Sequence, residues 1–247
     1  MRKPINEANL LVWIGAPLLF MLLMFSRDFG DIYIAMLVLW GFFFFKDILI
    51  SDKKITFPIE RTAGGRVQSF LLALVFYAVF LAFTTIMMNL FSPGTLQSTG
   101  IFAQAIEVVK LQSTGMLQAS EPILQNSKIL MVIGWAFLIP VVETVLFNGR
   151  MFEALYDGLR KKGVNVHQFG VAIITLILFI GAISTIYHLT SKNLASVPLM
   201  ITFMFFTLSG YLVWWKKQLR EAIFMHIIGN FIAVLAVIGI AAQATMG

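Results

Sequence analysis

Charged residues are scarce in this sequence. Asp, Glu, Lys and Arg make up 12% of its 247 residues, against about 25% in a typical soluble domain. Hydrophobic residues make up 59%, and the mean hydropathy is +0.89. So few charged residues cannot cover the surface of a water-soluble domain. Lipid must therefore be part of the solvent. The composition predicts an integral membrane protein.

Cysteine is absent, which excludes disulfides and cysteine-ligated metal sites. No glycine-rich nucleotide-binding motif occurs, and the pair Gly64-Gly65 indicates only a turn. The net charge is +6, but the basic residues lie between apolar runs rather than in one patch. We therefore expect these charges to orient the chain in a membrane, and we expect no nucleic-acid partner.

Seven apolar segments come near the length of about 20 residues that a membrane-spanning helix needs. They are Leu10–Phe25, Ile32–Phe45, Val67–Phe91, Ile129–Phe147, Phe169–His188, Val197–Trp214 and Ala222–Ala241. No small-residue cleavage site follows the first segment, so we expect it to be an uncleaved helix rather than a signal peptide. The predicted fold is all-α, a polytopic membrane bundle of about seven transmembrane helices.

The Lys and Arg residues are divided unevenly between the two sides of such a bundle. Fourteen of the eighteen fall in segments on the side of the N-terminus, and only Arg27, Lys110, Lys128 and Lys192 fall on the other. The positive-inside rule then places the N-terminus in the cytoplasm and the C-terminus outside. The longest stretch between spans, Ser92–Lys128, lies on the outer side and is expected to be a connector of loop and helix, with helical spacing over Ile101–Leu111.

A few polar residues interrupt the apolar segments. Glu143 has apolar neighbours on both sides, and a carboxylate inside a membrane is costly and is functional by default. His188 closes the fifth predicted span, and His226 opens the seventh. Asn230 lies four residues after His226, so the two share one helix face. A histidine or asparagine in a membrane helix more often serves as an interhelical hydrogen-bonding group, but the joint occurrence of these four favours a functional site.

Three patterns in the second half of the chain resemble the type II CAAX prenyl endopeptidase family, also called the CAAX protease and bacteriocin-processing or Abi family of intramembrane proteases. That family carries Glu-Glu-x-x-x-Arg, then Phe-x-x-x-His, then His-x-x-x-Asn. Residues 140–149 read PVVETVLFNG, residues 184–188 read STIYH, and residues 226–230 read HIIGN. The resemblance covers roughly Ile129 to Val237, and the N-terminal half matches only as generic membrane helices.

The match departs from the family pattern at three positions. Thr144 stands where the family has its second Glu, Asn148 stands where it has Arg, and Ser184 replaces the Phe. Arg150 lies two residues after the position of the motif's Arg. Because two residues turn a helix by about 200°, we do not expect Arg150 to take the place of that Arg. The departures predict weaker catalysis, an altered pH optimum, or a member that has lost its activity.

The resemblance implies a function and a set of site residues. Glu143 with His188 would activate water for attack on a peptide carbonyl, and His226 with Asn230 would stabilise the oxyanion. It implies no cofactor, and a membrane-presented peptide or protein as substrate, either prenylated or bacteriocin-like. We expect one membrane domain over residues 1–247, with N-terminal helices and the outer connector in 1–128 and the catalytic core in 129–247. The expected location is the plasma membrane of a prokaryote, in contact with its lipid.

Straight spans would not bring these residues together. At ~1.5 Å rise per residue, His226 would lie just beneath the cytoplasmic face and His188 near the outer face. A fourth helix that runs on toward Leu159 would place Glu143 nearer the midplane, and a fifth helix that starts well outside the membrane or bends near Gly181 would bring His188 inward.

Three alternatives stay open. Glu143 with two histidines could hold a catalytic zinc ion, although no His-Glu-x-x-His motif occurs and Asn is an unusual partner. The chain could be a non-catalytic family member that serves as a membrane scaffold, immunity or partner protein, since the second Glu and the Arg are missing. It could also be a transporter that uses Glu143 as a proton relay, although no inverted repeat is evident.

Overall fold

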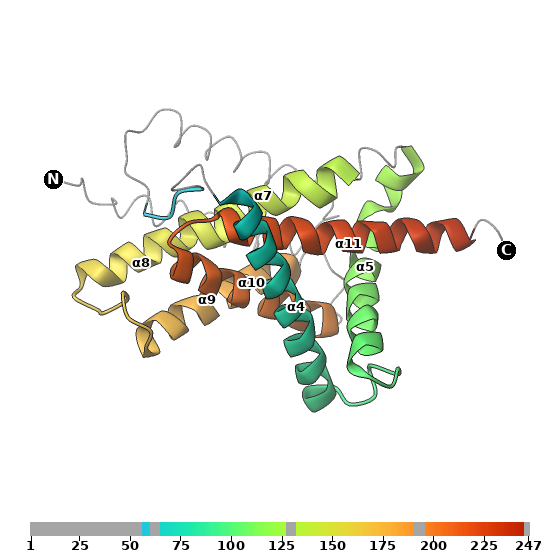
Figure 1. Ribbon diagram of the computed structural model, residues 1–247, viewed down its shortest axis with the longest axis horizontal. Helices are drawn as coiled ribbons and strands as arrows, with labels where there is room; N and C mark the ends of the chain where they lie inside the picture. Colours follow the sequence, from blue (N-terminus) through green and yellow to red (C-terminus); the bar gives the residue numbers. More distant parts are fainter. Residues whose placement is uncertain (1–55, 60–64, 127–131, 190–195, 245–247) are drawn as a thin grey trace.

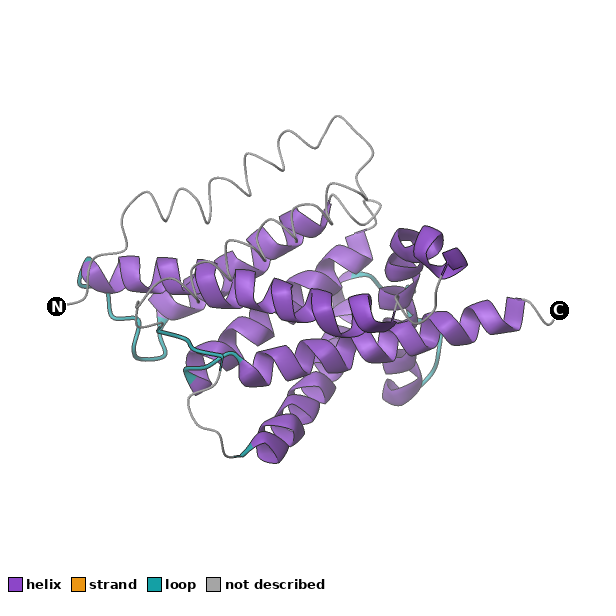
Figure 2. Ribbon diagram, turned by 90° about the horizontal axis from the view of Figure 1, so that it is seen from above, coloured by secondary structure: helices purple, strands orange, loops and turns teal. Residues whose placement is uncertain are grey.

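The computed structural model describes residues 56–59, 65–126, 132–189 and 196–244. Every regular element in these ranges is a helix (Figure 2). In chain order they are α4 (Arg66–Phe91), α5 (Ile101–Asn126), the π-helical η2 (Val132–Leu138), α7 (Ile139–Thr144), the π-helical η3 (Val145–Met151), α8 (Phe152–Lys161), α9 (Val171–Leu189), α10 (Ser196–Lys216) and α11 (Arg220–Ala244). The predicted all-α fold is confirmed for this part of the chain.

Five helices in the described ranges are long and apolar enough to cross a membrane. They are Arg66–Phe91, Gly134–Lys161, Val171–His188, Pro198–Lys216 and Arg220–Gly239. These correspond to the last five of the seven predicted spans. The first two predicted spans, Leu10–Phe25 and Ile32–Phe45, lie outside the described residues. The total of seven and the orientation of the chain therefore stay predictions.

The fourth predicted span continues well beyond Phe147. Elements η2, α7, η3 and α8 follow one another without a break from Val132 to Lys161, and this confirms the prediction that the helix runs on toward Leu159. Pro140 lies in the first turn of α7 and has no N–H to donate to the preceding turn. A wider π-helical turn before it accommodates that missing bond, and such turns are frequent at functional sites. The extension moves Glu143 toward the middle of the helix.

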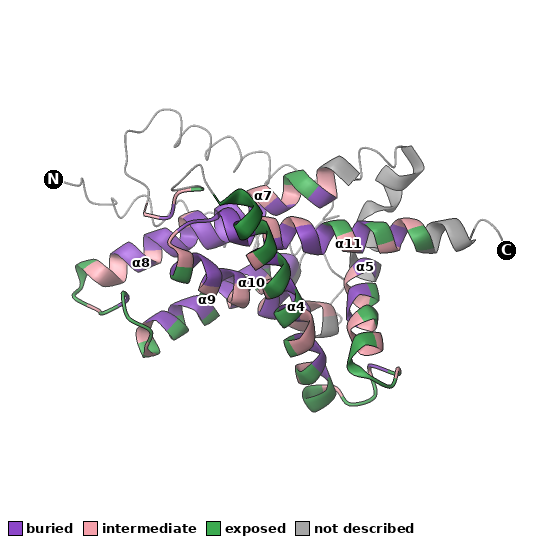
Figure 3. Ribbon diagram, in the orientation of Figure 1, coloured by how far each residue is buried: buried purple, intermediate pink, exposed green. Residues whose placement is uncertain are grey.

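The spans pack into one bundle in which α9 and α10 lie side by side (Figure 1). Helix α11 packs against α4, α5, η2 and α7 and so touches most of the structure. Buried residues gather along α8, α10 and the middle of α11, whereas α4 carries many exposed apolar side chains (Figure 3). Such an apolar outer face is suited to lipid.

The connector between the third and fourth spans is more helical than expected. The predicted helix over Ile101–Leu111 extends to Asn126 and passes through Gly115. A single glycine costs a helix only about 1 kcal/mol, which is too little to end it. Glu107 in α5 accepts hydrogen bonds from the backbone N–H groups of Gln97 and Ser98 and thereby fixes the loop before the helix. Helix α5 packs against α4 and α11.

Helix α9 packs tightly against α10 at Gly181. A Cβ atom at this position would lie 3.1 Å from the carbonyl oxygen of Phe203 and would collide with Thr207 Oγ1. We expect Gly181→Ala to lower the free energy of unfolding by about 1–3 kcal/mol, as overpacking does. The control is Gly158→Ala in α8, where nothing lies within 4 Å of the added Cβ and the better helix propensity of Ala stabilises. Thermal unfolding of both variants in detergent measures the difference, and equal melting temperatures would contradict this packing.

Candidate active site

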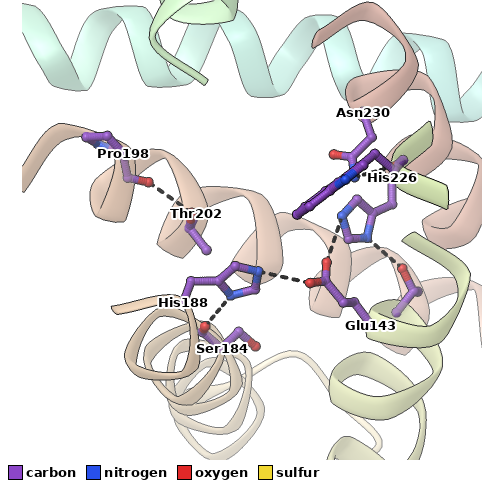
Figure 4. A network of polar contacts seen from close by, with 9 residues as sticks. Glu143, Ser184, His188, Pro198, Thr202, His226 and Asn230 are labelled. Atoms are coloured by element: carbon purple, nitrogen blue, oxygen red, sulfur yellow. Dashed lines mark hydrogen bonds and ion pairs between the residues drawn. The ribbon is translucent and has the colours of Figure 1, made fainter. Parts of the chain in front are cut away.

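Glu143 lies at the centre of a buried polar cluster at the end of α7. Its carboxylate is held between two imidazole rings from two other helices (Figure 4). Oε1 lies 3.2 Å from Nε2 of His188 on α9, and Oε2 lies 3.4 Å from Nε2 of His226 on α11. All three residues are at most 5% exposed. The structure therefore brings together three of the four predicted site residues around one carboxylate.

His188 is oriented by its own helix. Its Nδ1 lies 2.6 Å from the backbone carbonyl oxygen of Ser184, one turn earlier. A carbonyl oxygen can only accept a hydrogen bond, so Nδ1 carries a proton and donates it. This contact leaves Nε2 to face Glu143. A histidine held in this way has a fixed tautomer when it is neutral.

The contact between His188 and Glu143 requires one proton. With Nδ1 protonated, a neutral His188 presents only a lone pair at Nε2, and an ionised Glu143 presents only lone pairs at Oε1. Two lone pairs do not bond at 3.2 Å. Either Oε1 or Nε2 therefore holds a proton, which the two residues share. Such a pair can both take up a proton and give one up.

His226 is held from both sides of its ring. Nδ1 lies 3.0 Å from Oγ1 of Thr144, the residue next to Glu143. The ring of Phe205 lies 4.7 Å from the imidazole centroid, and the ring of Phe206 lies 5.5 Å away, edge-on. His226 thus bridges the end of α7 and the face of α10.

Aromatic rings form an apolar wall around the cluster. Phe206 and Phe147 lie within 5.4 and 6.3 Å of the His188 ring, measured between centroids. Tyr187 packs against Phe147 at 5.1 Å. These side chains are buried, so they surround the two histidines with apolar atoms. Electrostatic interactions in such a setting are stronger than they are in water.

Asn230, the fourth predicted residue, lies one turn after His226 on α11. Its side-chain nitrogen donates a hydrogen bond of 3.0 Å to the backbone carbonyl of Trp135 in η2. Figure 4 shows it beside His226, apart from the contact between Glu143 and His188. The amide nitrogen carries two hydrogens, and the bond to Trp135 uses one of them. The second π-helical segment, η3, begins directly after Thr144, so π-helical turns flank Glu143 on both sides.

The positions that depart from the family pattern have defined contacts. Asn148 donates a hydrogen bond of 3.2 Å to the carbonyl of Phe206 and accepts one of 3.3 Å from Ser209, so it joins η3 to α10. Ser184 supplies the carbonyl that orients His188. Thr144 contacts His226. Sequence reasoning treated these residues only as losses, because nothing in the sequence states which helix lies opposite each of them.

His167 lies outside this cluster. It is exposed in the loop between α8 and α9, and its Nδ1 lies 2.8 Å from the hydroxyl of Tyr156. Among the described residues, no group of three or more His, Asp or Glu side chains is arranged to hold a metal ion. The roles assigned to Glu143, His188, His226 and Asn230 stay predictions.

Comparison with known protein families finds a match in the second half of the chain. Residues 125–232 match the family model described as type II CAAX prenyl endopeptidase Rce1-like. The matched range contains all four predicted site residues. No curated protein and no solved structure matches the chain. The resemblance seen in the sequence is therefore confirmed over residues 125–232, which match the Rce1-like type II CAAX prenyl endopeptidase family, a family of proteases, and the helices of the described ranges are those of an integral membrane protein.

Proposed function

We propose that this chain is an intramembrane endopeptidase that hydrolyses a peptide bond with a water molecule activated by Glu143 and His188. The observation that carries the proposal is the buried carboxylate of Glu143 with one imidazole Nε2 at each of its two oxygens. A carboxylate that shares a proton with a histidine is suited to general acid–base catalysis, because proton transfer in both directions is available. The family match supports the same class of reaction.

The proposed reaction begins with water beside Glu143. The water oxygen attacks the carbonyl carbon of the peptide bond while one of its protons passes to the carboxylate. The carbonyl oxygen becomes the oxyanion of a tetrahedral intermediate. The C–N bond then breaks, and the pair of Glu143 and His188 delivers a proton to the leaving nitrogen. The products are a new carboxyl group and a new amine, and the site returns to its starting protonation state.

The proposed oxyanion donors are His226 and Asn230. Nε2–H of His226 points toward Glu143 in the resting site, and a small rotation of the ring would share this donor with a substrate oxygen. Asn230 would contribute the amide hydrogen that its bond to Trp135 does not use. Donors set by a helix and surrounded by aromatic rings need little reorganisation when charge develops, which is how oxyanion sites lower a barrier.

The proposed substrate is a membrane-presented peptide or protein, as the prenyl endopeptidase family name suggests. Prenylated tails and bacteriocin-like peptides both fit a site reached from within a lipid-embedded bundle. The proposed mechanism uses no cofactor. Zinc-dependent hydrolysis is the alternative mechanism for the same site. We place the protein in the plasma membrane of a prokaryote, with lipid as its surroundings.

A non-catalytic role is the second candidate. Thr144 and Asn148 replace two charged residues of the family motif, and Asn148 links η3 to α10 in a way that a purely structural protein would also need. In that case the fold would serve as a scaffold, immunity or partner protein. The following experiment separates the two candidates.

We predict that Glu143→Gln lowers cleavage by at least about 100-fold, the range expected for loss of a general base, while the melting temperature shows that the protein remains folded. His188→Ala is expected to lose cleavage as well. The exposed His167 provides the matched control, and His167→Ala retains wild-type cleavage. The measurement uses purified protein in liposomes with a library of membrane peptides that includes prenylated tails, with and without a chelator. Cleavage by Glu143→Gln at the wild-type rate would contradict the proposal, and loss of activity with chelator would favour zinc.

A further inference from the structure

The hydroxyl of Thr144 is part of the cluster, although no motif assigns it a role. Its Oγ1 lies 3.0 Å from Nδ1 of His226, and Thr144 has no exposed surface. The contact joins residues 82 positions apart, so it is a tertiary interaction rather than a feature of one helix. On the other edge of the ring, Nε2 lies 3.4 Å from Oε2 of Glu143. Thr144 and Glu143 therefore hold opposite edges of one imidazole.

The chemistry of the three groups sets the direction of these bonds. Oε2 of Glu143 accepts a hydrogen bond whether the proton shared with His188 lies on Oε1 or on the His188 ring, so Nε2 of His226 must carry the proton that faces Oε2. A neutral imidazole has one N–H, so Nδ1 then carries a lone pair. A threonine hydroxyl has a hydrogen to donate to that lone pair. The arrangement is complete when Thr144 donates to Nδ1 and Nε2–H donates to Glu143.

We propose that Thr144 is a positioning residue, which orients the ring of His226 so that its Nε2–H points at the reacting centre. This inference rests on the proposed function of the site. The hydroxyl also suits the other protonation state, because it can rotate and accept a hydrogen bond from Nδ1–H if His226 takes up a second proton. A carboxylate at this position, as the family motif has it, could only accept. The replacement of Glu by Thr thus keeps a polar group at Nδ1 and adds no second charge beside Glu143.

Neighbouring residues show why the hydroxyl is needed. Phe205 and Phe206 pack against His226 through ring contacts at 4.7 and 5.5 Å. Apolar contacts limit how far the ring can move, but they do not distinguish its two nitrogens. The bond to Thr144 does distinguish them, because it sets which nitrogen accepts. Loss of the hydroxyl would leave a buried nitrogen facing an apolar group, and unmade hydrogen bonds of this kind are costly.

The activity test compares two substitutions at Thr144. Thr144→Val keeps the shape and removes the hydroxyl, and we expect kcat to fall by about tenfold, the size of one buried hydrogen bond, with KM within about twofold. Thr144→Ser restores the hydroxyl and is expected to restore most of kcat. The control is Thr85→Val on α4, where a buried threonine hydroxyl bonds to the carbonyl of Leu81 in its own helix, and kcat is expected to stay unchanged. Wild-type kcat in Thr144→Val would overturn the proposal.

A second readout does not depend on cleavage. Nitrogen-15 NMR of the histidine-labelled chain reports which ring nitrogen of His226 is protonated, with its signals assigned by their loss in His226→Gln. We expect the neutral ring to carry its proton on Nε2, and we expect the hydrogen-bond shift of Nδ1 to disappear in Thr144→Val and to remain in Thr144→Ser. A wild-type proton on Nδ1 of the neutral ring, or an unchanged spectrum in Thr144→Val, would overturn the proposal. If no variant cleaves any peptide, the proposed function fails, and the spectrum alone still decides the role of Thr144.

Discussion

The arrangement of this bundle depends on one constraint, the cost of a carboxylate among apolar helices. An ion taken out of water loses several kcal/mol of hydration, and only close partners offset that loss. Glu143 obtains its two imidazole partners from α9 and α11. Three spans must therefore converge on a single point. The long helix from Gly134 to Lys161, with π-helical turns on either side of Glu143, makes that convergence possible.

The histidines that offset the cost of the buried carboxylate also supply the groups that the proposed reaction needs. His188 shares a proton with Glu143 because the Ser184 carbonyl has already fixed its other nitrogen. His226 turns a donor toward the same group because Thr144 lies at its far edge. Aromatic rings from α10 and η3 pack against the two histidines, and Asn148 joins those two elements. The contacts that hold the helices together thus also position the proton that Glu143 and His188 share for transfer in the proposed reaction.

Much of the fold was readable from the sequence, because membrane spans are set by length and hydropathy. Five predicted spans were found, and Glu143, His188 and His226 came together as the motifs indicated. The sequence could not reveal the π-helical turns, since these arise from how Pro140 and its neighbours pack. It also could not show that Thr144 meets His226, because that contact depends on the rotation of α11 relative to α7. Substitutions that looked like defects in the motif are, in the structure, hydrogen-bonding partners.

The most direct test of a water activated by Glu143 is a single turnover in water enriched in oxygen-18. If Glu143 acts as a general base, the new carboxyl group of the cleaved peptide takes up one oxygen-18 atom in the first turnover, and Glu143→Gln yields no labelled product. If Glu143 itself attacked the peptide, an anhydride would form as the amine leaves; water that opens it at the Glu143 carbonyl carbon would leave a Glu143 oxygen in the product, which would then be unlabelled. Unlabelled product from the wild type would contradict the account.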